Sequence, residues 1–149
     1  MALGRALTLA LRQLVDEMHE RLAAQGFDDL RPAFGYVLNA AATSAMNASE
    51  IAAVLGMTKQ GAAKLLSEMQ AAGYIVRRGS DQDGRVRAIE LTDRGVQALT
   101  AATDAQFAIE QHWSDLTSRQ DTLALRRVLG AVISEASSDG APPPLRPAW

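Results

Sequence analysis

Residues 47–73 read Asn47-Ala-Ser-Glu-Ile-Ala-Ala-Val-Leu-Gly-Met-Thr-Lys-Gln-Gly-Ala-Ala-Lys-Leu-Leu-Ser-Glu-Met-Gln-Ala-Ala-Gly73. The run predicts a helix after Asn47, because Asn47 and Glu50 have the spacing of a capping box. Gly56 follows the last apolar residue, where a left-handed helix end is expected, and Thr58 can cap a second helix only two residues later. Residues 47–73 therefore predict two helices that are joined by a tight turn.

The second of these helices has two chemically different faces, because its apolar residues recur at helical spacing. The core face comprises Ala62, Leu65, Leu66, Met69 and Ala72, and the opposite face carries Gln60, Ala63, Lys64 and Ser67, with Thr58 and Lys59 at its start. Short, hydrogen-bonding and cationic side chains suit entry into a DNA major groove, where glutamine can bond adenine. A solvated surface face is the alternative, since these are ordinary surface residue types.

A two-stranded ribbon is predicted next, with strands at residues 74–78 and 86–91 around a loop of turn-forming residues. Ile89 and Leu91 share parity, so both can pack on the body of the protein. Arg87 and Arg85 lie on the same face of this strand, closer to the tip of the hairpin. A hairpin with arginines at its tip can contact the minor groove of DNA or the flanking phosphates. The ribbon's candidate DNA contacts are Arg77, Arg78, Arg85 and Arg87. The alternative is that these arginines pair with Asp81 and Asp83.

These segments resemble the MarR family of winged helix-turn-helix transcriptional regulators. The resemblance depends on Thr58-Lys59-Gln60, Gly73-Tyr74-Ile75, Asp83-Gly84-Arg85 and Leu91-Thr92-Asp93-Arg94-Gly95. It covers residues 47–95 closely and the flanking helices only by pattern. It implies a mainly α fold with a small β-hairpin wing and with N- and C-terminal dimerisation helices. It also implies a homodimer that binds pseudo-palindromic double-stranded DNA, usually with an affinity that a small ligand or oxidation reduces.

The flanking segments divide the chain into regions. We expect residues 1–30 to contain a long amphipathic helix that ends near Gly26, and residues 31–95 to form the DNA-binding region. Residues 96–136 hold the C-terminal dimerisation helices, and the Pro-rich residues 137–149, which end at Trp149, form a flexible tail. The resemblance implies that the first helix forms the dimer interface with the last two. Its apolar stripe could instead pack within one chain.

A ligand cleft between the dimerisation helices and the DNA-binding region is a further implication of the resemblance. Pro32 is well placed to begin a helix in this part of the chain. The expected lining is Met18, Phe34, Val37 and Trp113, around a small aromatic ligand. Core packing explains the same residues without a ligand and is the preferred interpretation.

After the ribbon, Thr92 can cap a long helix that begins at Asp93. Its predicted buried side comprises Val96, Leu99, Thr103, Phe107 and Trp113. A change in its tilt would alter the spacing of two DNA-binding surfaces in a dimer. Thr117 and Gln120 have capping spacing for a last helix, whose apolar residues Leu125, Val128, Leu129, Val132 and Ile133 are typical of an interface.

Composition narrows the classes of function. The 149 residues suffice for one domain, and the absence of cysteine excludes disulfides, thiolate metal sites and the thiol-based peroxide sensing of some MarR regulators. The net charge is −2, yet residues 56–88 hold six Lys or Arg against three Asp or Glu. This local charge of +3 leaves −5 elsewhere, which fits a specific DNA binder better than a wholly basic one. No apolar run is long enough for a membrane span, so we expect a cytoplasmic protein.

Enzymatic activity is not expected, because the sequence has no phosphate-binding loop and no nucleophile with a paired histidine. Asp16, His19 and Glu20 lie on one helical turn and could hold a metal with His112. A solvated helix face explains them better, so we expect no metal and no cofactor. The expected function is a sequence-specific DNA-binding regulator, a repressor that a small ligand releases. The alternative is a winged-helix module that binds protein and not DNA, but such a module need not concentrate cations on its second helix and ribbon.

Overall fold

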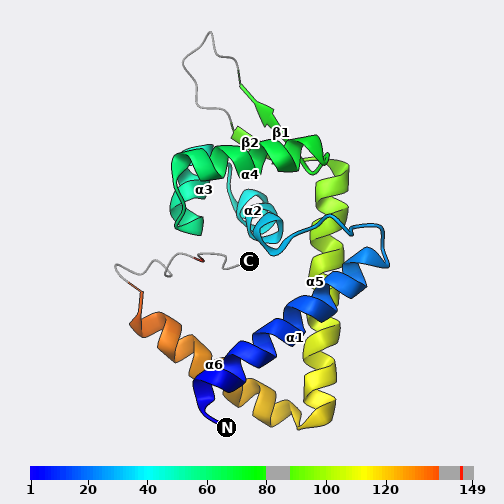
Figure 1. Cartoon of the computed structure of the whole chain (residues 1–149), viewed down its shortest axis with the longest axis vertical. Coiled ribbons are helices and arrows are strands. Elements are labelled where there is room, and N and C mark those ends of the chain that lie inside the picture. The colour runs from blue at the N-terminus through cyan, green and yellow to red at the C-terminus, as the bar shows by residue number, and fades with distance from the viewer. Residues whose placement is uncertain (80–87, 138–144, 146–149) are drawn as a thin grey trace.

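The computed structural model describes residues 1–79, 88–137 and 145. It holds six helices and one two-stranded antiparallel sheet (Figure 1). The helices are α1 (Leu3–Ala23), α2 (Pro32–Thr43), α3 (Ala48–Leu55), α4 (Lys59–Ala71), α5 (Asp93–Leu116) and α6 (Arg119–Glu135), and the strands are β1 (Ile75–Arg78) and β2 (Ala88–Leu91). The predicted mainly α fold with a small hairpin is confirmed. No helix in the described ranges is long and apolar enough to cross a membrane.

Local signals set the ends of the central helices as predicted. The Asn47 side chain accepts hydrogen bonds from the backbone of Ser49 and Glu50, and the Glu50 carboxylate accepts one from the Asn47 N–H, which completes the capping box. Gly56 ends α3 in the left-handed conformation, with φ of 61°. Thr58 then caps α4 by accepting a 3.0 Å hydrogen bond from the Gly61 N–H. The predicted helix-turn-helix is confirmed.

The hairpin packs against α4 through β1. In its register Ile75 lies opposite Leu91 and Arg78 opposite Ala88. Ile89 is buried, and its N–H donates to the Met46 carbonyl, so the segment before α3 also contacts β2. The predicted parity is therefore confirmed for Ile89, which fastens the base of the hairpin to the core.

The core fills the space where α2, α3, α4 and the hairpin base meet the first half of α5. Its fully buried side chains include Val37, Leu38, Ile51, Leu55, Leu66, Met69, Tyr74 and Ile89. Pro32 begins α2 as predicted. Phe34 packs edge-on against the Tyr74 ring at a centroid distance of 5.9 Å, which joins α2 to the start of the hairpin.

The predicted buried side of α5 is wrong for three of its five residues, whereas Leu99 is half-buried against the core and Trp113 is half-buried. The buried residues of α5 are Gly95, Ala98, Ala101, Ala102, Ala105 and Ile109. Val96, Thr103 and Phe107 are exposed instead, and Phe107 is 63% exposed. Alanines let α1 approach the α5 backbone closely, and Val96 and Phe107 lie on the exposed side of the helix.

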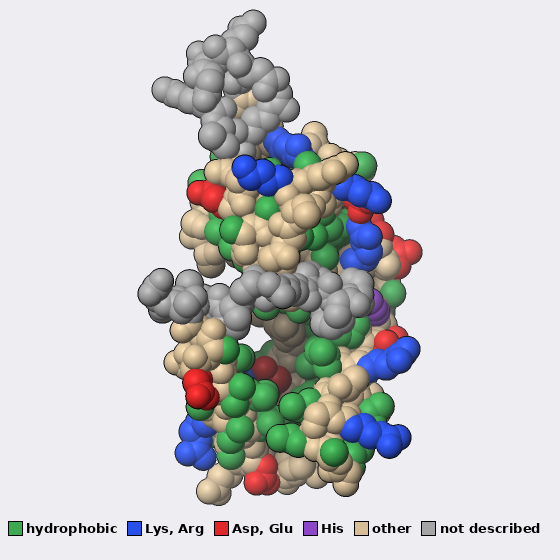
Figure 2. Space-filling model, turned by 60° about the vertical axis from the view of Figure 1, so that its left-hand side comes forward, with side chains coloured by type: hydrophobic (Ala, Val, Ile, Leu, Met, Phe, Trp, Pro, Cys, Tyr) green, Lys and Arg blue, Asp and Glu red, His purple; other side chains and the backbone are tan. Residues whose placement is uncertain are grey.

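At the other end of the molecule, α1 crosses α5, and α6 turns back from the end of α5 (Figure 1). The cap of α6 is Ser118, which accepts from the Asp121 N–H, and not the predicted Thr117, because Thr117 still belongs to the end of α5 and donates to the Trp113 carbonyl. Considering only the described residues, α6 buries none of its own. Hydrophobic side chains gather on this lower part of the surface (Figure 2).

Candidate nucleic-acid interface

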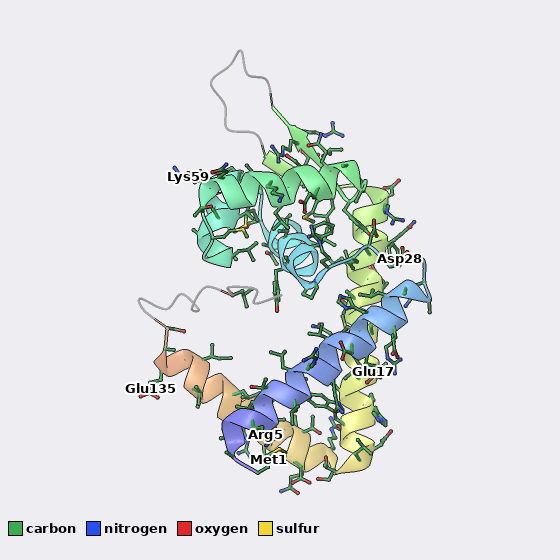
Figure 3. All side chains as sticks on the ribbon, in the orientation of Figure 1. Met1, Arg5, Glu17, Asp28, Lys59 and Glu135 are labelled. Atoms are coloured by element: carbon green, nitrogen blue, oxygen red, sulfur yellow. The ribbon has the colours of Figure 1, made fainter. Side chains whose placement is uncertain are left out.

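The outer face of α4 carries the side chains that the sequence singled out. Six residues are exposed there, namely Thr58, Lys59, Gln60, Ala63, Lys64 and Ser67. The opposite face is buried through Ala62, Leu65, Leu66 and Met69. Figure 3 shows Lys59 at the exposed start of α4, far from the end of the molecule that holds Arg5. The sequence periodicity therefore places these six side chains on one solvent-facing surface.

Arg77 does not extend freely from β1. Its Nη2 donates to the Ala63 carbonyl at 3.2 Å and to the Ser67 Oγ at 3.4 Å, and Ser67 Oγ donates to the same carbonyl at 2.8 Å. The Arg77 Nε is buried and has no hydrogen-bond partner among the described residues. Arg77 therefore ties the base of the hairpin to the middle of α4, an arrangement that the spacing of the sequence did not indicate.

Arg78 lies on the outside of the hairpin. Its side chain is 74% exposed, and its Nε lies 2.8 Å from the Glu90 carboxylate across the sheet. Glu90 was not among the predicted partners of these arginines, which were Asp81 and Asp83. An ion pair this exposed is weak, so Arg78 can leave Glu90 for a phosphate at little cost. Arg85 and Arg87, the predicted contacts at the wing tip, lie outside the described residues, as do Asp81, Asp83 and Trp149.

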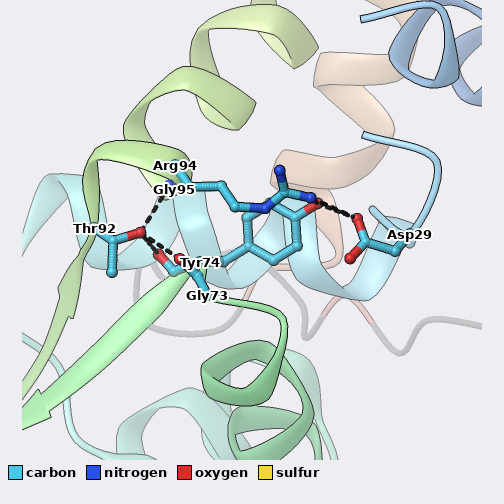
Figure 4. Close-up of polar contacts among 6 residues, drawn as sticks. All are labelled: Asp29, Gly73, Tyr74, Thr92, Arg94 and Gly95. Atoms are coloured by element: carbon cyan, nitrogen blue, oxygen red, sulfur yellow. Dashed lines mark hydrogen bonds and ion pairs between the residues drawn. The ribbon is translucent and has the colours of Figure 1, made fainter. Parts of the chain in front are cut away.

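Polar contacts around Tyr74 attach the start of the hairpin to the loop before α2 and to the first turn of α5 (Figure 4). The Tyr74 hydroxyl donates to the Asp29 carboxylate, and Arg94 Nη2 lies 3.2 Å from that hydroxyl and 3.3 Å from Asp29. The Arg94 guanidinium also covers the Tyr74 ring, 4.8 Å from its centroid. Burial, followed by the hydrogen bond to Asp29, raises the pKa of Tyr74 to about 12.

Thr92 makes the second attachment. Its hydroxyl donates to the Gly73 carbonyl at 2.6 Å and accepts from the Gly95 N–H at 3.0 Å, while its N–H donates to the Tyr74 carbonyl at 3.1 Å. Tyr74 and Arg94 belong to the motifs that resemble the MarR family, but no contact of theirs was predicted. Asp29 was missed, because it lies in the loop before α2 and its partners are distant in sequence.

A cavity of about 110 Å³ lies between α1, α2 and α5. Of the four predicted lining residues, Met18 lines it. Phe34 and Val37 do not, because both are buried in the core, and Trp113 lies outside the lining set as well. The wall is formed by Leu11, Leu14, Val15, Met18, His19, Leu22, Leu30, Arg31, Pro32, Gly35, Tyr36, Asn39, Ala102, Thr103 and Gln106.

His19 thus lines this cavity. Over the described parts of the chain, no group of three or more His, Asp or Glu side chains could hold a metal ion.

The comparisons with known proteins agree with this architecture. A model of the MarR family matches residues 29–86. Transcriptional repressor MprA of Escherichia coli strain K12 is 28% identical over 131 residues, which cover 86% of this chain and 74% of that protein. The structure of transcriptional repressor CouR bound to a 23-mer DNA duplex is 27% identical, with a TM-score of 0.73 and with coverage of 88% of this chain and 92% of CouR.

A second structure, of CouR bound to p-coumaroyl-CoA, is 26% identical with a TM-score of 0.70 and covers 88% of this chain and 91% of CouR. Each of these three matches covers at least 86% of this chain. With its capped α3–α4 pair, its hairpin and its Leu91–Gly95 segment, the chain is similar to regulators of the MarR family, whose model matches residues 29–86.

Proposed function

We propose that this protein is a transcriptional repressor that binds double-stranded DNA as a homodimer and is released by a small ligand. The observation that carries the proposal is the outer face of α4, where six exposed short, polar or cationic residues stand opposite a buried apolar face. A slender helix of this kind can enter the major groove and contact base edges. The structure of CouR on a DNA duplex supports the same role for this chain. We infer a non-enzymatic, cytoplasmic protein.

Pairing of two chains is supported by the lower part of the molecule. On α6, Leu123, Leu125, Val128, Leu129, Val132 and Ile133 are each at least 39% exposed, and on α5 so are Phe107 and Leu116. Exposed apolar side chains in such number mark a surface that another protein covers. A second copy of the chain would cover these apolar side chains of α5 and α6. Two α4 helices would then occupy half-sites about 34 to 36 Å apart on a pseudo-palindromic operator.

The experiment that tests DNA binding begins with selection of duplexes from a random library at fixed salt. Affinity for the selected duplex is then measured against salt concentration. Lys64→Ala should weaken binding and lower the salt slope by about 1, because one phosphate contact is lost. Arg5→Ala is the matched control, since it removes the same charge at the opposite end of the molecule (Figure 3). Equal effects of the two substitutions would contradict the assignment of α4.

Sequence readout needs a separate variant. Gln60 is exposed in the first turn of α4 and is our candidate for base contact. Gln60→Ala should relax the sequence preference at one position of each half-site, by about 1 to 3 kcal/mol if the contact is bidentate. An equal loss of affinity on all sequences would remove Gln60 from base readout. Failure of the wild-type protein to enrich any duplex would favour the alternative role as a protein-binding winged helix.

A further inference from the structure

We propose that Asp29 is a positioning residue of the DNA-binding surface, which sets the angle of the hairpin relative to α4 without contacting DNA. Its carboxylate accepts a hydrogen bond from the Tyr74 hydroxyl, just before β1, and lies 3.3 Å from Arg94 Nη2, just after β2. This role rests on the proposed function, because the angle of the hairpin matters only if α4 and the hairpin bind the same duplex.

The loop that carries Asp29 is fixed in the core. It joins α1 to α2, and the side chains on either side of the two aspartates, Phe27 and Leu30, are buried. The Leu30 N–H donates to the Phe27 carbonyl at 3.2 Å, which closes a tight turn around Asp28 and Asp29. The Phe27 ring also lies against the Tyr74 ring, with the centroids 6.5 Å apart. The turn therefore holds the Asp29 carboxylate beside the hairpin in one orientation.

The two ends of the hairpin meet at this carboxylate. Tyr74 is fully buried, and its carbonyl accepts a 3.1 Å hydrogen bond from the Thr92 N–H, so the chain enters and leaves the hairpin at one point. The Arg94 guanidinium fills the space beside this point, 4.8 Å from the Tyr74 ring centroid and 5.3 Å from that of Phe27. A hydrogen bond from a buried donor to a carboxylate is stronger than one between neutral groups. Asp29 is therefore the main attachment of the hairpin base to the loop.

The same loop also holds α4. Arg31, two residues after Asp29, pairs with the Glu68 carboxylate of α4. A segment of three residues thus contacts both the hairpin and α4, and it fixes one relative to the other. The Arg31 and Glu68 side chains are 54% and 38% exposed, so their ion pair is weak and Asp29 carries the larger part of this restraint.

A small rotation at the hairpin base would displace its DNA contacts. A strand rises about 3.3 Å per residue, so Arg78 lies about 13 Å from Tyr74 along β1, and a rotation of about 10° would move it by about 2 Å. Such a shift is enough to break a hydrogen bond with a phosphate. Figure 3 shows Asp28, the neighbour of Asp29, across the DNA-binding half of the molecule from Lys59. An effect of Asp29 on DNA affinity would therefore act through the hairpin.

The first test uses the sign of the change in DNA affinity. Asp29→Asn keeps the size of the side chain and removes a negative charge, which by electrostatics alone would leave DNA binding unchanged or strengthen it. We expect the opposite, a loss of about two- to thirtyfold in affinity for the selected duplex, as for substitutions that act through a packed network. Asp28→Asn is the matched control, because Asp28 is exposed and its carboxylate has no hydrogen bond or ion pair with a residue that the structure describes.

Tyr74→Phe tests the same contact without a change in charge. It removes the hydroxyl that Asp29 accepts from and keeps the buried ring. It should also weaken DNA binding, and the double variant with Asp29→Asn should lose less affinity than the product of the two separate losses. Losses that multiply fully would show that the two residues act independently, which contradicts the proposal.

Amide hydrogen exchange of the protein without DNA separates positioning from a general loss of stability. Asp29→Asn should speed exchange at the Thr92 N–H, which bonds the Tyr74 carbonyl, and leave exchange at Leu65 and Leu66 of α4 unchanged. Equal acceleration at the hairpin base and in α4 would show that Asp29 only stabilises the fold, and would overturn the proposal.

The outcomes also separate this role from the proposed function. A wild type that enriches a duplex, with Asp29→Asn binding it as tightly as Asp28→Asn does, would refute only the positioning role. A wild type that enriches no duplex would refute the DNA-binding role, and faster exchange confined to the hairpin base in Asp29→Asn would still show that Asp29 holds the hairpin.

Discussion

Gly95→Ala should destabilise the protein strongly, because Gly95 packs against the backbone of the hairpin. A Cβ built on Gly95 would lie 2.1 Å from the Tyr74 carbonyl oxygen and 3.2 Å from its carbon. Ordinary carbon–oxygen contacts are about 3.3 Å or longer, so the first turn of α5 must move by about 1 Å. Backbone atoms stand on both sides of this contact, and no side chain can rotate to relieve it.

The magnitude follows from the contacts that such a shift breaks. Overpacking costs about 1 to 3 kcal/mol, and loss of the Thr92 cap costs about 1 kcal/mol more. The hydrogen bond from the Thr92 N–H to the Tyr74 carbonyl adds about 1 kcal/mol. Alanine regains about 1 kcal/mol through its helix propensity. The net loss in free energy of unfolding is therefore about 2 to 4 kcal/mol, a large share of the roughly 5 to 15 kcal/mol of a typical domain.

Chemical denaturation at one fixed protein concentration measures this loss. Gly35→Ala is the control, because a Cβ there meets nothing within 4 Å and the residue also lies within a helix. It should leave stability unchanged or raise it by up to about 1 kcal/mol. If Gly95→Ala unfolds within about 0.5 kcal/mol of the wild type, the tight contact between α5 and the hairpin does not exist as described.

Three further predictions concern the cap, the tyrosine and the hairpin arginines. Asn47→Ala should lower the free energy of unfolding by about 1 kcal/mol through loss of the α3 capping box, and an unchanged denaturation midpoint would contradict that role. In a Tyr36→Phe background, ultraviolet titration of Tyr74 should show a midpoint near 12 and not 10. The pKa of Tyr74 is higher in the folded than in the unfolded protein, so this shift stabilises the fold fully below pH 10 and progressively less as the pH rises towards 12. A titration midpoint near 10 would exclude the buried contact with Asp29. Arg77→Ala should reduce DNA affinity and leave its salt dependence unchanged, because Arg77 contacts α4. Arg78→Ala should lower the salt slope by about 1, because Arg78 is exposed and free to contact a phosphate. The reverse pattern would show that Arg77 is the phosphate contact.

Local signals made the helix-turn-helix predictable. Asn47, Gly56 and Thr58 each act within four residues of themselves, so the local sequence is sufficient to set those helix ends. The outer face of α4 followed from helical periodicity alone. The parity of Ile89 was likewise sufficient to orient β2 on the core.

Contacts between distant residues were not predictable in this way. The pair between Arg31 and Glu68 spans 37 positions, and nothing in either neighbourhood selects the other residue. The same holds for Asp29 and Tyr74. Phe107 was misassigned because periodicity shows that a face is apolar but does not show whether its partner lies in the same chain.

The alanine-rich seam of α5 has a consequence for how the protein behaves on dilution. Because small side chains face inwards and Phe107 and its apolar neighbours face outwards, a lone subunit has little interior of its own in its lower half. If two copies associate as proposed, folding of that half and association become one equilibrium, and the midpoint of thermal unfolding should rise with protein concentration. The fraction of operator bound by such a dimer would rise more steeply than linearly with the concentration of the protein.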